Sequence, residues 1–336
     1  MKHTAEAVSL GHPDKTSDFI SSFILDKLIE QDPNTRYALE VMVKDDTVVL
    51  GGEVSTSAKM DNIDNWVKEA LCEIGYTNEY AKVWCDCAIN PSKLNIISLI
   101  SKQSEDIGRG VEQNGWGDQG VFVGYAAQGN GNINPELYLA RKLNTEIYNF
   151  AKSDVSLGLG LDIKTQITLD DDGNIETAIV AVPMLRDISL HKFVVQILGQ
   201  NPKNMVINGT GRYTFHGSIA DCGITGRKLA CDFYSTAAPI GGGSPWTKDA
   251  SKADLTLNLY ARRLALEFLE DNDECFVYLS SCIGRSELPS ATVKTIKSGV
   301  VSEHNIVIDK KPSEIIMELG LKKPVFAEIC RHSVGL

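Results

Sequence analysis

The sequence lacks the patterns that place a protein in a membrane or in an oxidising compartment. No apolar run approaches the roughly 20 residues of a membrane span, and residues 1–6 show no hydrophobic stretch of the signal-peptide kind. The eight cysteines are scattered, with no CxxC pair and no zinc spacing. We therefore expect a cytoplasmic protein without a membrane partner and with reduced, mostly buried thiols, several of them in apolar strand-like runs (Cys231, Cys275 and Cys282).

Two common nucleotide-binding motifs are also missing. There is no GxxxxGK(S/T), which excludes a P-loop protein, and no GxGxxG after a strand-like run, so no dinucleotide-binding fold is indicated. The 44 acidic residues outnumber the 33 lysines and arginines, and the net charge of −11 repels nucleic acid and free nucleotide at long range. We expect no nucleic-acid partner, and a polyphosphate site in this chain would need a local group of cations with metal ions beside it.

What the sequence does contain is the ordinary composition of a soluble globular protein. Its 336 residues, 43% of them hydrophobic and 23% charged, are enough for two or three domains. Alternating residues predict two hairpins, one over 37–54 with its turn at Asp45-Asp46 and one over 165–184 with its turn at 170–174. Periodicity predicts helices at 61–74, 188–200, 254–270 and 312–319, and a strand-like run covers 275–283.

Two stretches of the chain echo each other. A Gly-Asp-Gln-Gly turn at 117–120 leads to the helical run 137–143, and an Ala-Asp-Cys-Gly turn at 220–223 leads to the similar run 259–264. The echo suggests repeated α+β units, while chance resemblance explains it equally well. The segment 104–117 is rich in glycine and polar residues and is typical of a mobile loop.

The stretch Gly11-His12-Pro13-Asp14-Lys15 places an imidazole, a carboxylate and an amine at the start of a predicted helix. Pro13 and the polar residues after it supply the helix start, and apolar residues follow at helical spacing at Ile20, Phe23, Ile24, Leu28 and Ile29. The N–H groups of a helix N-terminus favour an anion, so with His12 and Lys15 beside them the expected ligand is a phosphate. Asp14 then needs a divalent metal between itself and the phosphates. A capped helix with solvated charges is the alternative.

Similar groupings of Asp with Lys or Arg recur at other loop ends, at 162–164, 221–228, 241–249 and 252–254. The glycines at 241–243 would let backbone N–H groups approach a bulky ligand, although each grouping alone also fits a flexible turn or a solvated face. If the groupings converge, five cations would offset the charge of a triphosphate: Lys15, Lys164, Arg227, Lys228 and Lys248. Asp14 and Asp254 would then hold magnesium.

These segments resemble the S-adenosylmethionine synthetase family. The matching stretches follow the family's order over nearly the whole chain: Gly11–Lys15, Gly51–Ala58, Lys102–Ser104, Gly117–Gly120, Asp221–Lys228, Gly241–Gly243 and Lys248–Asp254. The resemblance implies an α+β fold of three similar units around a pseudo-threefold axis, which we expect as domains at 1–100, 115–216 and 217–334, with 104–117 as a mobile gate loop. It also implies at least a homodimer, paired into a tetramer in many members, with the active site between subunits.

The resemblance further implies methionine adenosyltransferase activity. Methionine sulfur attacks C5′ of ATP, the triphosphate leaves, and the same site hydrolyses it to pyrophosphate and phosphate. Because neutral sulfur needs no general base, catalysis must come from positioning and from stabilising the charge that develops on the leaving oxygen. We expect His12 at that oxygen and the five cations on the polyphosphate. Asp14 and Asp254 would bind two magnesium ions, and Glu40 would bind potassium.

The substrate contacts follow from the same resemblance. Besides His12 and the cations, ATP is expected to contact Asp162, Arg212, Tyr213, Asp221 and Ser244, with the ring of Tyr213 stacked on adenine. The amino and carboxylate groups of methionine are expected at Glu53, Gln103, Asp221 and Lys252, since a paired acid and base suit a zwitterion.

The chain also departs from the family's pattern. It is shorter than most members, with a reduced loop at 104–117, and Leu10 stands where an acidic residue usually precedes the first motif. His216 and Ser218 replace a glycine and a proline, and residues 244–247 are divergent. Two other functions therefore stay open: a catalytically weak homologue that acts as a nucleotide-binding or regulatory subunit, and a triphosphatase without methionine chemistry.

Overall fold

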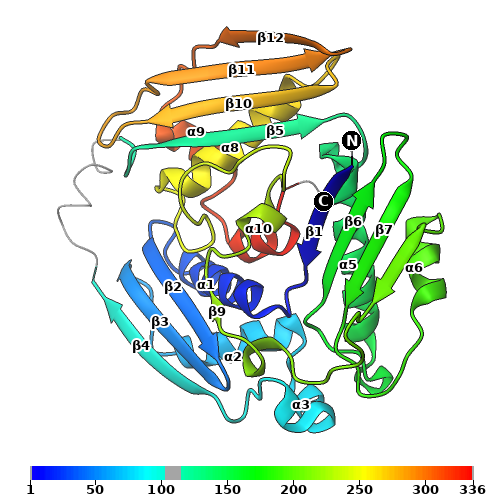
Figure 1. The fold of residues 1–336 in the computed structure, drawn as a ribbon. Coiled ribbons are helices and arrows are strands. Elements are labelled where there is room, and N and C mark those ends of the chain that lie inside the picture. The colour runs from blue at the N-terminus through cyan, green and yellow to red at the C-terminus, as the bar shows by residue number, and fades with distance from the viewer. Residues whose placement is uncertain (1, 103–114, 335–336) are drawn as a thin grey trace.

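A computed structural model describes residues 2–102 and 115–334, and within them the strands form three four-stranded sheets that surround the centre of the molecule (Figure 1). The first sheet has the order β1 (His3–Val8), β6 (Lys164–Leu169), β7 (Ile175–Ala181), β8 (Asn204–Ile207). The second has the order β12 (Val300–Asn305), β11 (Ser290–Lys297), β10 (Glu274–Ser281), β5 (Gly120–Ala127). The third has the order β4 (Asn95–Ser101), β3 (Thr47–Ser55), β2 (Arg36–Lys44), β9 (Gly223–Ile224).

One long helix lies against each sheet. α1 (Pro13–Ile29) packs on β2, α5 (Pro135–Ser153) on β1 and β6, and α8 (Ala253–Glu267) on β5 and β10. The shorter helices are α2 (Ile63–Ile74), α3 (Asn78–Trp84), α6 (His191–Leu198), α7 (Leu229–Asp232), α9 (Pro312–Glu318) and α10 (Phe326–His332), with 3-10 turns η1 (Cys85–Cys87), η2 (Asn130–Asn132), η3 (Val155–Leu157) and η4 (Gly217–Ile219). This arrangement confirms the expected α+β fold of three similar units, and the echoing runs 137–143 and 259–264 lie on corresponding helices, α5 and α8.

The sheets exchange strands between the three predicted domains. β1 pairs antiparallel with β6, so that His3 lies opposite Leu169; β5 pairs in the same way with β10, and β9 with β2. Every sheet therefore takes strands from two of the ranges 1–100, 115–216 and 217–334. The domain boundaries stay a prediction, and each sheet contains strands from both sides of at least one of them.

The locally predicted elements are present. β2 and β3 form the first hairpin, with Asp45 at a φ of 51° in its turn, and β6 and β7 form the second. The helices expected at 61–74, 188–200, 254–270 and 312–319 correspond to α2, α6, α8 and α9, and the run 275–283 corresponds to β10. Residues 104–114 of the expected gate loop lie outside the described residues.

The thiols are less buried than expected. All eight cysteines are free, but only Cys231, Cys275 and Cys330 are buried, while Cys72 and Cys85 are exposed. Cys231 lies on α7 and not in the strand-like run expected for it. The sequence did not reveal this helix, because four residues are too few to show a helical period. In the described part of the chain no helix is both long and apolar enough to cross a membrane.

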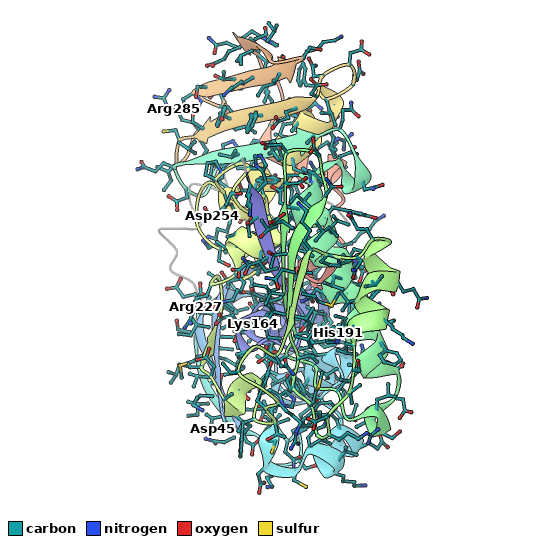
Figure 2. All side chains as sticks on the ribbon, turned by 45° about the vertical axis from the view of Figure 1, so that its right-hand side comes forward. Asp45, Lys164, His191, Arg227, Asp254 and Arg285 are labelled. Atoms are coloured by element: carbon teal, nitrogen blue, oxygen red, sulfur yellow. The ribbon has the colours of Figure 1, made fainter. Side chains whose placement is uncertain are left out.

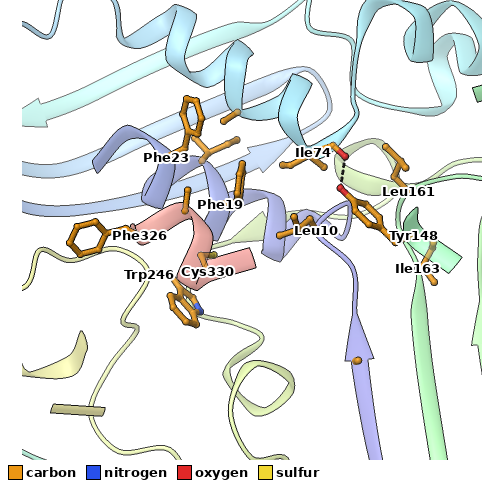
Figure 3. Close-up of a cluster of buried hydrophobic side chains, with 14 of the residues drawn as sticks. Leu10, Phe19, Phe23, Ile74, Tyr148, Leu161, Ile163, Trp246, Phe326 and Cys330 are labelled. Carbon is orange, nitrogen blue, oxygen red and sulfur yellow. Dashed lines mark hydrogen bonds between the residues drawn. The ribbon is translucent and has the colours of Figure 1, made fainter. Parts of the chain in front are cut away.

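Helix α1 is buried on every side. Sixteen of its 17 residues are buried, the expected apolar stripe together with the polar residues of the opposite face. On the apolar side Phe19 and Phe23 belong to the cluster that Phe326 of α10 also joins, as Figure 3 shows. A helix in this position cannot leave its charged side chains in water, so each of them needs a partner inside the protein.

The partner of Lys15 is Asp232, the last residue of α7. The Lys15 ammonium donates to Asp232 Oδ2 at 2.7 Å and lies 3.4 Å from Asp18 Oδ2, and the indole N–H of Trp246 donates to the same Asp232 oxygen at 2.8 Å. Burial alone would lower the pKa of Lys15, but Asp232, Cys330 and Asp18 together more than offset it and raise the pKa above its ordinary value. Burial raises the pKa of Asp18, and its carboxylate lies farther from the ammonium than that of Asp232, so Asp232 is the main counter-ion.

The other acidic residues of α1 bind backbone N–H groups. Asp18 accepts the N–H of Gly226 at 2.8 Å, and Asp26 accepts the N–H groups of Phe326 and Ala327 at 2.9 and 2.8 Å. These bonds hold two segments from the last third of the chain against the first helix.

We predict that Lys15→Met destabilises the fold by about 3–5 kcal/mol, because it leaves Asp232 and Asp18 as buried carboxylates without their cation. Urea unfolding followed by circular dichroism measures the change. Lys93→Met is the control: it breaks an ion pair with Asp86 whose side chains are 58% and 88% exposed, and it should leave the unfolding midpoint unchanged. A loss confined to triphosphate affinity, with stability intact, would show instead that Lys15 serves a polyphosphate.

Candidate active site

His12 is the N-terminal capping residue of α1, whose start the sequence pattern attributes to Pro13 and the polar residues after it. Its side chain is 2% exposed, and its Nδ1 accepts the N–H of Asp14 at 3.2 Å. Because Nδ1 accepts, the proton of the neutral imidazole sits on Nε2, which is therefore a hydrogen-bond donor. Burial, together with the nearby cations Lys228 and Lys164, lowers the pKa of His12 to about 3, so the ring is neutral at pH 7.

Asp14, at the same helix end, forms ion pairs with two cations. The residue is fully buried; its Oδ2 lies 2.6 Å from Lys228 Nζ, and its Oδ1 lies 3.3 Å from Arg227 Nε. Oδ1 also accepts the N–H of Ile224 at 2.9 Å. The loop comes this close because residue 223 is glycine: a Cβ there would meet a backbone oxygen at the start of α1 at 2.1 Å. The first motif and the 221–228 segment thus form one cluster.

Asp162 and Lys164 approach this cluster from the start of β6. Asp162 Oδ2 accepts the N–H of Gly217 at 3.0 Å, while its Oδ1 is buried without a hydrogen-bond partner among the described residues. Burial raises the pKa of Asp162 to about 6. Lys164 is exposed, yet it lies near enough to His12 to lower the pKa of that ring. A buried oxygen without a partner beside a cation is an arrangement that a polar ligand completes.

Further residues expected at ATP lie in the segment after β8. Arg212 is 44% exposed and pairs with Asp187 at 3.2 Å. Tyr213 is half-buried, and burial raises the pKa of its hydroxyl. Asp221 is exposed, and its charge acts to raise the pKa of His12, which places Asp221 at the cluster.

A second group of charges surrounds the start of α8. Lys248 forms an ion pair with Asp254, whose Oδ1 accepts the N–H of Gly243 at 2.8 Å. Gly242 has a φ of 71°, and a Cβ there would meet Asp254 Oδ1 at 2.3 Å, so this turn requires glycine. The hydroxyl of Ser244 is buried without a partner in the described part of the chain.

The structure thus brings the expected residues together in two sets. The α1 set comprises His12, Asp14, Lys164, Asp221, Arg227 and Lys228, and the α8 set comprises Ser244, Lys248 and Asp254. Their loops touch, since a Cβ at Gly226 would lie 2.8 Å from Ser244 Cβ. In Figure 2, Arg227 and Asp254 lie toward the same edge of the molecule.

Lys15 belongs to neither set. Its side chain is 3% exposed and its ammonium is neutralised by Asp232 inside the protein, so the structure does not support the expected contact of Lys15 with polyphosphate. The sequence offered no signal for this pairing, because the two residues are 217 positions apart.

The residues expected at methionine and potassium are more dispersed. Ala38 of β2 pairs with Glu53 of β3 on one side and forms an isolated bridge to Lys248 on the other. Strand β2 therefore lies between Glu53 and the α8 set. Lys252 is the residue before α8, and Gln103 lies outside the described residues. Glu40 on β2 accepts a hydrogen bond from the hydroxyl of Thr225, a contact that the sequence analysis missed although the motif contains this threonine.

The two carboxylates fit magnesium only together with a polyphosphate. In the described part of the chain no group of three or more His, Cys, Asp or Glu side chains is placed to hold a metal ion. Magnesium, however, is commonly bound by one or two carboxylates plus phosphate oxygens and water. Asp14 and Asp254 each offer one carboxylate next to cations that would hold the phosphates. The donor set therefore fits the metal.

Known proteins are similar to this chain in both sequence and fold. The family model of the S-adenosylmethionine synthetase N-terminal domain matches residues 1–105, and that of the C-terminal domain matches residues 215–334. A solved structure, described as an unusual S-adenosylmethionine synthetase from Campylobacter jejuni, matches at 29% identity and a TM-score of 0.85, over 100% of this chain and 95% of that chain. The matched ranges contain every member of the two sets except Lys164. The chain belongs to the S-adenosylmethionine synthetase family.

Proposed function

We propose that this protein is a methionine adenosyltransferase that forms S-adenosylmethionine from ATP and L-methionine. The methionine sulfur attacks C5′ of ATP, the bond between C5′ and oxygen breaks, and the triphosphate leaves. Water then cleaves the triphosphate to pyrophosphate and phosphate in the same site. Family membership supports the overall reaction, and the α1 set supports the roles assigned below.

The observation that carries the proposal is a neutral histidine donor among cations. With a pKa of about 3 the His12 ring is uncharged at pH 7, and its Nδ1 is occupied by the Asp14 N–H, so that Nε2–H is left to donate. We assign this donor to the oxygen that leaves C5′. The cap holds the ring in place before substrate binds, and a fixed donor stabilises developing negative charge without reorganisation. Neutral sulfur requires no base beside it.

The cations of both sets suit a polyphosphate. Arg227 is 48% exposed and contacts Asp14 together with Lys228, while Lys248 pairs with Asp254. We propose that these cations and Lys164 bind phosphate oxygens, which frees the two carboxylates for metal. Magnesium bound there would neutralise the phosphate charge. Glu40, an exposed carboxylate beside Thr225, is our proposed potassium ligand.

The remaining residues are assigned to the rest of the two substrates. The proposed contacts of the nucleoside part of ATP are Asp162, Arg212, Tyr213, Asp221 and Ser244, and those of the methionine zwitterion are Glu53, Gln103, Asp221 and Lys252. Asp162 Oδ1 and the Ser244 hydroxyl, which have no hydrogen-bond partner among the described residues, support the first assignment, because a bound nucleoside would supply such bonds.

We further propose that two copies of the chain assemble with the active site between them and that such dimers can pair into tetramers. The exposed large apolar side chains include Met42 on β2 (38%), Ile97 and Leu99 on β4 (41% and 65%) and Val121 on β5 (58%). Exposed apolar side chains of this kind mark protein interfaces when they are contiguous. A second copy seated there would bury them.

An incubation with ATP, Mg²⁺ and K⁺, with and without L-methionine, tests the proposed activity. We expect S-adenosylmethionine only when methionine is present, with pyrophosphate and phosphate in equal amounts. Release of phosphate from added triphosphate, without S-adenosylmethionine, would identify a triphosphatase. Nucleotide binding without either reaction would identify a catalytically weak homologue.

Replacing the proposed donor should separate the two chemical steps. We expect His12→Ala to slow S-adenosylmethionine formation by roughly 100- to 1,000-fold, the usual effect of removing a fixed donor to a leaving or attacking oxygen, with a much smaller effect on the hydrolysis of added triphosphate. Single-turnover kinetics measures both rates. His304→Ala, which removes an exposed ring on β12, is the control. Equal losses in both steps would show that His12 does not act on the C5′–oxygen bond.

The shared active site predicts that breaking the dimer also removes activity. Leu99→Glu places a charge on the exposed apolar strand β4, and we expect a monomer in light scattering with little S-adenosylmethionine formation. Val307→Glu is the control, since Val307 is 93% exposed and lies outside the sheets. A monomeric Leu99→Glu protein with full activity would contradict a site between subunits.

A further inference from the structure

His216 is fully buried in a box of aromatic rings. The ring centroids of Trp84, Tyr80 and Tyr76 lie 4.6, 5.9 and 6.4 Å from that of His216. Tyr80 and Trp84 come from α3, whereas His216 belongs to the segment that precedes η4. A buried imidazole is stable only when both ring nitrogens have hydrogen-bond partners, and the structure provides one for each.

Three hydrogen bonds run through this box in one direction. The Leu161 N–H donates to the Tyr80 hydroxyl at 3.1 Å, the Tyr80 hydroxyl lies 2.6 Å from His216 Nε2, and His216 Nδ1 lies 2.7 Å from the carbonyl oxygen of Thr214. Because a carbonyl only accepts, Nδ1 carries the proton, and Nε2 of the neutral ring then accepts the Tyr80 O–H. Burial lowers the pKa of His216 to about 4, so the ring keeps this neutral form at pH 7. We call these three bonds the relay.

The relay joins the two segments that carry the proposed nucleoside contacts. Leu161 directly precedes Asp162, and Thr214 directly follows Tyr213. The Gly217 N–H donates to Asp162 Oδ2 at 3.0 Å, which links the same two segments a second time. Residue 217 must be glycine for this, since its φ is 59° and a Cβ would meet a tyrosine hydroxyl of the box at 2.8 Å.

We propose that His216 is a positioning residue for the adenosine part of ATP. Through the relay it sets the spacing between the strand end that carries Asp162 and the loop that carries Tyr213, and it touches no reacting atom itself. The inference rests on the proposed function, because that function assigns the nucleoside to these two segments. His216 stands where the family pattern has glycine, which has no side chain to form the relay, so this positioning is a property of this chain.

Tyr80→Phe tests the proposal because it keeps the ring and removes only the hydroxyl. The change breaks two of the three relay bonds, and we expect the KM for ATP to rise roughly threefold to tenfold, a factor of the size of the net contribution of one buried hydrogen bond. The KM for added tripolyphosphate, which has no nucleoside, should stay within about twofold of the wild type. Calorimetric binding of a non-hydrolysable ATP analogue should weaken by the same factor as the KM for ATP.

The matched control is Tyr148→Phe. It also removes a buried tyrosine hydroxyl, one that donates to the Ile74 carbonyl (Figure 3), but it takes no part in the relay. Both KM values should therefore stay at the wild-type level in this variant, which separates loss of the relay from the general cost of a lost buried hydrogen bond.

Substitutions of His216 itself show which half of the relay matters. His216→Asn keeps an N–H near the position of Nδ1 for Thr214, but its amide oxygen falls short of the position of Nε2, where the Tyr80 hydroxyl is bound. His216→Ala has neither. We expect the asparagine variant to bind the ATP analogue more tightly than the alanine variant, because Thr214 adjoins Tyr213 in the chain.

Three results would overturn the proposal. The first is an equal rise of the KM values for ATP and tripolyphosphate in Tyr80→Phe, which would indicate general loosening. The second is unchanged binding of the ATP analogue in that variant. The third is a ¹⁵N spectrum in which the proton of His216 resides on Nε2. A wild-type protein that binds the analogue but forms no S-adenosylmethionine would instead contradict the proposed function alone, since analogue binding still reports on the relay.

Discussion

The buried ion pair between Lys15 and Asp232 is the interaction on which much of this fold depends. Helix α1 is enclosed on all sides, and an ammonium inside a protein costs several kcal/mol unless a carboxylate reaches it. α7, which packs against β1, must therefore keep Asp232 within reach of the first helix. The bonds of Asp18 and Asp26 to backbone N–H groups extend the same requirement to the loop before α7 and to the start of α10.

The enclosure of α1 also sets the chemistry of the proposed site. At an exposed helix start an imidazole would be solvated and would titrate near its ordinary pKa. Here burial and the cations beside Asp14 lower the pKa of His12, so that the ring is a neutral donor at physiological pH. Lys15 is neutralised within the protein, whereas Arg227, which is 48% exposed, and Lys228, which is 21% exposed, are the more accessible cations beside Asp14 at the same helix end.

Contacts between distant segments hold the rest of the site. Each sheet includes a strand from another stretch of the chain, and the relay through His216 connects α3, the residues before β6 and the segment before η4. Residues assigned to ATP therefore keep their spacing only while these long-range contacts are intact. A change far from the reacting atoms, such as the loss of the Tyr80 hydroxyl, can reach the site through the backbone.

The sequence by itself determined the hairpins, most of the longer helices and the residue types of the site, because turn residues, alternation and helical period act over a few neighbouring residues. The family resemblance also placed His12, Asp14, Arg227 and Lys228 in one site. Local patterns did not reveal the partner of Lys15 or the aromatic box around His216, which depend on segments far along the chain. Only the tertiary structure decided which charges stay exposed at the proposed site and which neutralise each other inside, because desolvation is a property of the packed chain and not of a sequence motif.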